Sequence, residues 1–141
     1  MRICVVSYHS SPLEPVGEGK SGGMSIVLRS LYDRLGLHSD IDIFVRGKGP
    51  PELARHGVRV IAIDEGDPRR FADEVVGRHA VKPYDLMHTH YWSSGVVGLY
   101  ARPVMRIPWL HTMHTVEVLK TIRRDKTRIA VEEEIMRSCD L

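Results

Sequence analysis

The chain has 141 residues, 43% of them hydrophobic and 27% charged, and its formal net charge is +2. This length suits one domain with a core of its own, and the balanced composition excludes a disordered or low-complexity chain. The small net charge gives no support to nucleic-acid binding, and no apolar run is long enough to predict a membrane-spanning helix.

The first part of the chain predicts a strand, a loop and a helix in succession. Residues 2–8 are apolar and partly β-branched, which is typical of a buried central strand. A loop with several prolines and glycines follows and leads through Gly22 and Gly23 into a helical pattern that Gly36 would end. The apolar residues that recur with helical spacing, and that predict the buried face of this helix, are Met24, Val27, Leu28, Leu31 and Leu35.

The middle of the chain predicts two strands and a helix. Residues 41–45 begin by alternating apolar with acidic side chains and predict the second strand, and residues 58–63 predict the third. Asp67 followed by Pro68 is typical of a helix start, because aspartate caps free amides and proline suits the first helical turn. This helix is expected to run to about His79.

The last part of the chain continues the alternation. Residues 85–89 and 108–112 predict the fourth and fifth strands, Ser93 or Ser94 would cap the helix between them, and a final helix is expected over about 127–138. Strands that alternate with helices indicate an α/β fold. We therefore expect a Rossmann-like, mostly parallel sheet with helices on both faces.

Two glycines lie where the first strand would pass into its helix. Bare amides at a helix N-terminus bind anions, and Gly22 and Gly23 would let a phosphate approach the backbone closely. The pair matches neither the dinucleotide-binding nor the P-loop pattern, so tight packing of strand against helix is the simpler interpretation of these residues alone.

Histidines lie at the ends of the fourth and fifth strands, at the sheet edge where parallel α/β proteins bind ligands. His88 and His90 lie two apart on a strand and should project to the same face, while His111 and His114 lie close together on the next strand end. Four histidines raise the alternative of a zinc site, but neither segment contains a thiol and alternation turns Asp85 to the opposite face. We expect no metal, and hydrogen bonding to a hydroxylated ligand is favoured.

A basic stretch follows the second histidine segment. Its members are Lys120, Arg123, Arg124, Lys126 and Arg128. Such a stretch is commonly a solvated face; it also suits recognition of a phosphate or carboxylate, or attraction to an anionic membrane surface.

Together these segments resemble the N-terminal domain of retaining glycosyltransferases with the GT-B fold, in family 4, which includes sucrose-phosphate synthases and mycothiol-pathway glycosyltransferases. The matching segments are Gly22-Gly23-Met24-Ser25, residues 85–92 with Ser94-Gly95, residues 111–115, Lys120, Arg128-Ile129 and Glu132-Glu133.

The resemblance implies roles for individual residues. Gly22 and Gly23 would bind the diphosphate of a nucleotide-sugar through their amides. His114 would be the catalytic residue, because it would orient the donor sugar or stabilise charge at the reacting centre.

The acceptor would be bound by residues that follow the fourth and fifth strands. Tyr91 and Thr115 would hydrogen-bond its hydroxyls. Lys120 and Arg128 would hold an acceptor phosphate where the acceptor carries one.

The resemblance also implies a domain organisation. Residues 1–141 would be a truncated N-terminal, acceptor-side domain, incomplete near its C-terminus, and the C-terminal domain that binds the nucleotide-sugar would be absent. We therefore expect no cofactor on this chain alone and no sugar transfer by it, since most donor contacts and the closed cleft would be missing.

A non-catalytic binding or protein-interaction domain derived from such an enzyme is the alternative. The expected partners are a nucleotide-sugar and a hydroxylated acceptor, with no nucleic acid; a homodimer or other association through an exposed sheet edge and peripheral membrane contact stay open. Cys4 and Cys139 are expected as free thiols of a reducing, cytoplasmic compartment.

Overall fold

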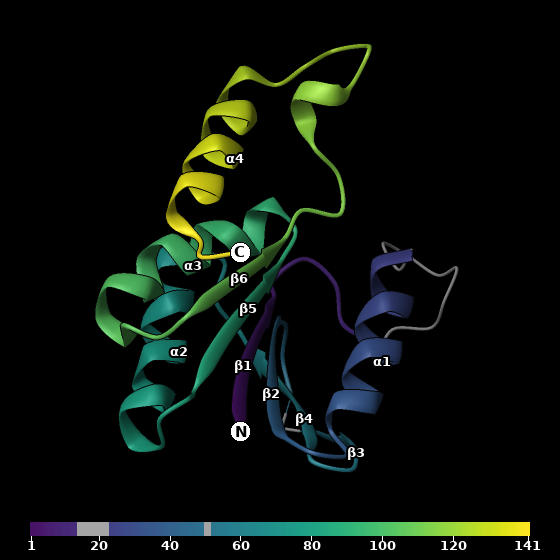
Figure 1. The fold of residues 1–141 in the computed structure, drawn as a ribbon, viewed down its shortest axis with the longest axis vertical. Helices are drawn as coiled ribbons and strands as arrows, with labels where there is room; N and C mark the ends of the chain where they lie inside the picture. The colour runs from purple at the N-terminus through teal and green to yellow at the C-terminus, as the bar shows by residue number, and fades with distance from the viewer. Residues whose placement is uncertain (14–22, 50–51) are drawn as a thin grey trace.

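A computed structural model describes residues 1–13, 23–49 and 52–141 (Figure 1). The elements in chain order are β1 (Arg2–Ser7), α1 (Gly23–Leu35), β2 (Asp40–Arg46), β3 (Glu52–Arg55), β4 (Val58–Ile63), α2 (Pro68–Val81), β5 (Leu86–His90), α3 (Trp92–Met105), β6 (Trp109–Thr112), the 3₁₀ helix η1 (Glu117–Leu119) and α4 (Lys126–Ser138).

The strands form one sheet in the order β3-β4-β2-β1-β5-β6. Every pair is parallel except β3 with β4, which is antiparallel and shifts register between Leu53 and Arg55. The expected α/β fold with a mostly parallel sheet is confirmed. Strand β3 was not predicted, because a strand of four residues with charged ends gives too short a pattern to recognise.

Helices cover both faces of the sheet. Cys4, Val6 and Met87 face the side of α2 and α3, where they share a core with Trp109. The other face carries Ile3, Val5 and the buried residues of β2 and β4, which pack against α1 (Figure 1). Successive residues of β1 therefore belong to opposite cores, which explains its unbroken apolar run. Both Cys4 and Cys139 are free cysteines, as expected.

The buried face of α1 matches the expected one only in part. Val27 and Leu35 are 45% and 38% exposed, whereas Ser25, Leu28 and Tyr32 are buried. The apolar spacing predicted the helix and the inward positions of Met24, Leu28 and Leu31, but Val27 and Leu35 turn outward. The reason is Tyr32, which is 1% exposed because its hydroxyl has partners inside the fold.

Helix starts illustrate one correct prediction and one wrong one. Asp67 caps α2, and its carboxylate accepts hydrogen bonds from the amides of Arg69 and Arg70. Neither Ser93 nor Ser94 caps α3, which has Tyr91 at its N-cap position without a side-chain cap. The Ser94 hydroxyl is used elsewhere: it accepts a hydrogen bond from the Tyr8 amide at 2.9 Å and joins α3 to the end of β1.

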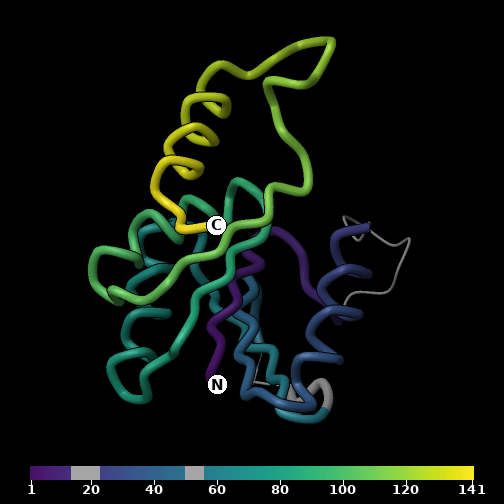
Figure 2. The backbone as a smooth tube through the Cα atoms, viewed as in Figure 1, coloured from purple at the N-terminus to yellow at the C-terminus, as the bar shows by residue number. Residues whose placement is uncertain are grey.

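Beyond β6 the chain leaves the sheet and returns to it through α4 (Figure 2). Asp125 caps α4 by accepting from the amides of Thr127 and Arg128. After α4, the amide of Asp140 donates to Trp109 O and the amide of His111 donates to Leu141 O. These bonds attach the returning backbone to β6. Within the described ranges, no helix is long and apolar enough to cross a membrane.

Candidate functional site

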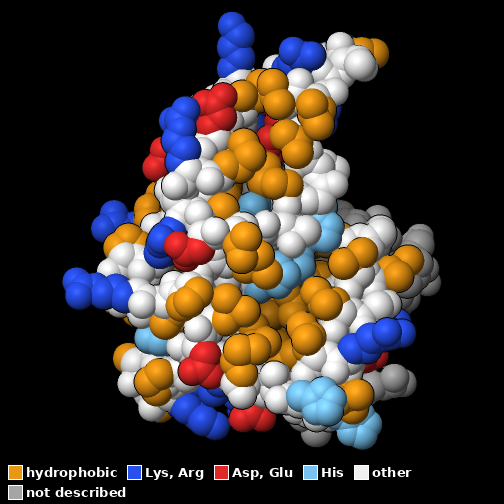
Figure 3. Space-filling view, in the orientation of Figure 1, with side chains coloured by type: hydrophobic (Ala, Val, Ile, Leu, Met, Phe, Trp, Pro, Cys, Tyr) orange, Lys and Arg blue, Asp and Glu red, His pale blue; other side chains and the backbone are white. Residues whose placement is uncertain are grey.

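The ends of β5 and β6 place their polar side chains on alternate faces. His88 pairs with Leu110, Thr89 with His111, and His90 with Thr112. Since paired residues of parallel strands share a face, His88 and His90 lie on the α1 side and His111 on the α3 side. Figure 3 shows histidine side chains gathered near the middle of the face in view, next to hydrophobic surface.

On the α1 side, the histidines form one connected group. The rings of His88 and His90 have centroids 4.0 Å apart, and Tyr32 Oη lies 2.7 Å from His88 Nδ1 and 2.6 Å from His90 Nε2. His90 Nδ1 is in turn 2.9 Å from His114 Nε2. Burial lowers the pKa of His88 to about 4 and that of His90 to about 2, and it also lowers the pKa of His114. These rings are therefore neutral at neutral pH.

On the α3 side, His111 belongs to a separate group. Trp109 Nε1 donates to Thr89 Oγ1 at 2.8 Å, and Thr89 Oγ1 lies 2.7 Å from His111 Nδ1. His111 Nε2 is 3.0 Å from Met113 Sδ. Burial lowers the pKa of His111 to about 4.

This division argues against a zinc site built from all four histidines, because the sheet separates His111 from His88 and His90. Among the described residues, no group of three or more His, Cys, Asp or Glu side chains is arranged to hold a metal ion. Both ring nitrogens of His88, His90 and His111, and Nε2 of His114, are instead engaged by hydroxyls, by sulfur or by one another.

Arg128 brings together the residues expected to bind the acceptor. Its Nη1 donates to Tyr91 Oη at 3.2 Å and its Nη2 donates to Thr115 Oγ1 at 2.9 Å. Its guanidinium also lies over the rings of Tyr91 and Trp92, at 5.0 and 5.6 Å from their centroids. Asp125 starts α4 so that Arg128 falls in the first turn and points toward the start of α3.

Two buried carboxylates hold Arg128 in place. Its Nε donates to Glu132 Oε1 at 2.7 Å, and its Nη1 lies 3.0 Å from Glu117 Oε2. Glu117 Oε2 also lies 2.7 Å from Nζ of Lys120, whose side chain is 48% exposed. The hydrogen bonds from Lys120 and the Asp125 amide lower the pKa of Glu117. The group thus contains two cations and two carboxylates, and Lys120 is its most exposed member.

The glycine segment is described only in part. Gly22 lies outside the described residues. Gly23 is the first residue of α1, and a Cβ added there would meet nothing within 4 Å among the described residues. Close packing of strand against helix therefore does not explain Gly23. Figure 1 shows this end of α1 on the side of the sheet where the parallel strands end.

Several features of this region were not anticipated from the sequence. Tyr91 and His114 have φ angles of 73° and 59°, in the left-handed region that non-glycine residues seldom adopt. Such backbone is often found at functional sites, and no local residue pattern signals it here. Tyr32 and Glu117 were also missed, because their partners come from other elements.

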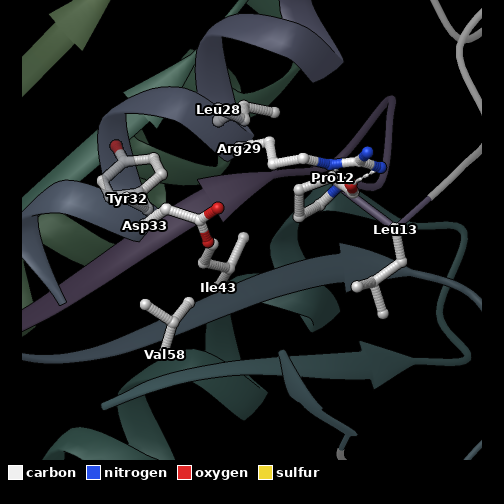
Figure 4. A pocket seen from close by; sticks show the side chains of 8 residues that line it. All are labelled: Pro12, Leu13, Leu28, Arg29, Tyr32, Asp33, Ile43 and Val58. Carbon is white, nitrogen blue, oxygen red and sulfur yellow. Dashed lines mark hydrogen bonds between the residues drawn. The ribbon is translucent and has the colours of Figure 1, made fainter. Parts of the chain in front are cut away.

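A separate cavity of about 240 Å³ lies between α1 and the sheet (Figure 4). It is lined by Pro12, Leu13, Leu28, Arg29, Tyr32, Asp33, Ile43 and Val58. None of these residues was predicted to bind donor or acceptor. Tyr32 belongs to both the cavity wall and the histidine group: it lines this cavity, and its hydroxyl is hydrogen-bonded to His88 and His90.

Comparison with solved structures supports the fold. The chain is similar to sucrose-phosphate synthase from Thermosynechococcus elongatus, with a TM-score of 0.85 and 28% identity over 99% of this chain and 41% of that one. This similarity is that of the N-terminal part of a GT-B glycosyltransferase, as expected.

Curated relatives give the same result. D-inositol 3-phosphate glycosyltransferase of Corynebacterium jeikeium is 31% identical, and that of Corynebacterium glutamicum is 35% identical. The alignments cover 100% and 99% of this chain but only 40% and 38% of those proteins. The profile of the glycosyl transferase 4-like domain matches residues 22–140. The chain therefore belongs to the glycosyl transferase 4-like domain family.

Proposed function

We propose that this chain is the acceptor-binding part of a glycosyltransferase that moves a sugar, with retention, from a nucleotide-sugar to a hydroxyl acceptor. The observation that carries the proposal is Arg128, whose guanidinium contacts Tyr91 Oη and Thr115 Oγ1. A fixed cation beside two hydroxyls suits an acceptor with both negative charge and hydroxyl groups. Because the relatives are named D-inositol 3-phosphate glycosyltransferases, a phosphorylated inositol is our proposed acceptor.

The charges around Arg128 suggest how a phosphate would be accommodated. Glu132, Tyr91 and Thr115 accept hydrogen bonds from three of the five donor hydrogens of the guanidinium, and Glu117 is ion-paired to it. Lys120 is half exposed and ion-paired to Glu117, so it is the cation that can turn toward an incoming phosphate. In this scheme, Arg128 positions the acceptor and Lys120 supplies mobile charge.

Lys120→Gln tests this arrangement. We expect the variant to bind inositol phosphate at least five-fold more weakly, which corresponds to about 1 kcal/mol at an exposed site, and to bind neutral inositol unchanged. NMR titration of the chain with each ligand gives both affinities. Arg137→Gln is the matched control, because Arg137 is exposed and paired with Glu133 on the last turn of α4. Equal losses for both ligands in Lys120→Gln would rule out the charge role.

On the donor side, we propose that Gly22 and Gly23 bind the diphosphate and that His114 contacts the sugar. Gly23→Val should leave the free energy of unfolding within about 1 kcal/mol, because the added side chain points into space free of the described residues. It should abolish binding of nucleoside diphosphates, because bulk at the first helical residue blocks approach to the amides. Urea unfolding and ligand titration separate the two effects. Undiminished nucleotide binding would contradict the phosphate role.

The chain spans about 40% of the length of the relatives it matches. We propose that residues 1–141 alone transfer no sugar, because the donor would be held on one side only and water would reach the reacting centre. Incubation with a panel of nucleotide-sugars and inositol phosphate, followed by mass spectrometry, tests this. A glycosylated product above the protein-free background would contradict the proposal.

A further inference from the structure

The hydroxyl of Tyr32 lies between two histidine rings inside the fold. Tyr32 Oη is 2.7 Å from His88 Nδ1 and 2.6 Å from His90 Nε2, and none of the three residues is more than 6% exposed. The group continues in both directions: His88 Nε2 lies 2.9 Å from Thr112 Oγ1, and His90 Nδ1 lies 2.9 Å from His114 Nε2. A continuous series of short hydrogen bonds, the Tyr32–His114 chain, thus links α1 to the residue proposed to contact the donor sugar.

Counting the hydrogens leaves only two possible sets of donors and acceptors for the hydrogen bonds of the Tyr32–His114 chain. A tyrosine hydroxyl has one hydrogen, so it donates to one ring nitrogen and must accept from the other. A neutral imidazole also has one N–H, so the choice made at Tyr32 determines the protonated nitrogen of both His88 and His90. Because His90 Nδ1 is hydrogen-bonded to His114 Nε2, the protonated nitrogen of His90 in turn determines that of His114. Since burial lowers the pKa of all three histidines, the neutral rings are the relevant species at neutral pH.

In the first arrangement, Tyr32 donates to His88 and accepts from His90 Nε2–H. His88 then donates from Nε2 to Thr112, and His90 accepts at Nδ1 from His114 Nε2–H. In the second arrangement every bond is reversed, and all three rings carry the proton on Nδ1. Both arrangements satisfy every contact, and in both the three rings share one tautomer.

We propose that Tyr32 is a positioning residue that, through His90, fixes His114 as the Nε2–H tautomer and leaves its Nδ1 as a hydrogen-bond acceptor. Neutral histidine intrinsically favours a proton on Nε2, and the first arrangement satisfies this preference in all three rings at once. His114 Nδ1 has no hydrogen bond within the described part of the chain, so its lone pair is available to a hydroxyl of the sugar. The backbone of His114, with φ at 59°, is a second restraint on the ring.

The inference rests on the proposed function only for the identity of the partner of His114. The tautomer itself is a property of the free protein. His111 provides an internal reference, because Met113 Sδ accepts but does not donate, so His111 must carry its proton on Nε2. His111 lies on the other face of the sheet and does not share the Tyr32–His114 chain.

The test is long-range ¹H–¹⁵N NMR of the protein labelled with ¹⁵N-histidine at pH 7.5, which reports the protonated nitrogen of each ring. We expect Nε2–H for His88, His90 and His114. In Tyr32→Phe, which keeps the ring that walls the cavity, His114 should change from one tautomer to a mixture while His111 is unaffected. In Figure 4 the hydroxyl of Tyr32 points away from Asp33, Ile43 and Val58, so its removal leaves that wall in place.

Tyr84→Phe is the matched control. Tyr84 is also a buried tyrosine, but its hydroxyl donates to Asp42 at 2.6 Å, so its removal should leave every histidine tautomer unchanged.

Different tautomers among His88, His90 and His114 in the unmodified protein would overturn the proposal, and this result does not require Tyr32→Phe to fold. Nδ1–H in all three rings would overturn the acceptor role of His114. An unchanged tautomer of His114 in Tyr32→Phe would remove Tyr32 as the positioning residue. A failure to bind nucleotide-sugars alters none of these spectra, so it contradicts the proposed function alone.

Discussion

Asp42 is a buried carboxylate at the opposite end of the sheet from the candidate site. Its side chain is 4% exposed, and it accepts hydrogen bonds from Arg2, Arg59 and Tyr84. Arg2 is itself largely buried and also donates from Nη1 to Lys82 O. The single negative charge of Asp42 therefore balances the guanidinium groups of Arg2 and Arg59, and that of Arg2 is largely shielded from solvent.

Asp42→Asn should be strongly destabilising for this reason. The substitution keeps the size of the side chain but leaves Arg2 without its counter-charge, and we expect the free energy of unfolding to fall by about 3 kcal/mol. Urea unfolding followed by circular dichroism gives the value. Asp64→Asn is the control, because Asp64 and Lys48 form an ion pair with side chains 68% and 83% exposed. A loss in Asp42→Asn no larger than in the control would show that the group contributes little.

At the scale of elements, α3 is held against the sheet by close contact at two glycines. A Cβ at Gly98 would lie 2.4 Å from Trp109 Cζ2, and one at Gly95 would lie 2.5 Å from Ile135 Cδ1. These glycines let α3 approach both β6 and α4. Since α3 begins at Tyr91 and Trp92, the same contacts set the position of the residues next to Arg128.

Alanine at two helical glycines should give opposite results. Gly98→Ala should lower the free energy of unfolding by roughly 2 kcal/mol, because Trp109 is fully buried and must move. Gly77→Ala, on the exposed face of α2 where a Cβ meets nothing within 4 Å among the described residues, should raise it by about 0.5–1 kcal/mol. Thermal unfolding of both variants tests this. Stabilisation by Gly98→Ala would show that the packing at Trp109 is loose.

The sequence predicted the parallel strands and the α-helices because each has a periodicity of its own. It also placed His88 and His90 on one face by strand alternation, which their ring contact confirms. What it could not predict depends on partners far along the chain. Tyr32 was missed because its hydroxyl meets its two histidine partners only after α1 packs on β5, and the separation of His111 from His88 follows from the register of β5 with β6.

At the scale of the whole molecule, neutral histidines lie on both faces of the sheet at the carboxyl ends of β5 and β6: His88 and His90 on one face and His111 on the other. In the unfolded chain these histidines take up protons near pH 6.5, whereas His88 and His111 in the native state do so only near pH 4 and His90 lower still. Between these pH values the unfolded chain binds more protons than the native state does. The contribution of these histidines to the free energy of unfolding is therefore fully present above pH 6.5 and is lost as the pH falls toward 4.

Unfolding by urea at a series of pH values should show this loss. Each of these histidines contributes at most roughly 1.4 kcal/mol per pH unit below pH 6.5. The slope should decrease in His90→Asn, which removes one titrating ring, provided that the variant folds. Equal stability at pH 7.5 and pH 5 in the unmodified protein would contradict the buried, neutral state of the histidines.

The short antiparallel strand β3 has a consequence for behaviour at high concentration. A parallel sheet ending at β4 would present a row of open donors and acceptors to which another molecule could add. Strand β3 covers that row with four residues whose pairing slips between Leu53 and Arg55, and a strand so brief and irregular is a poor template for sideways growth. At the other edge of the sheet, β6 also has four residues, and the backbone of residues 140 and 141 already forms two hydrogen bonds with it. Concentrated solutions should therefore resist polymerising strand by strand into filaments.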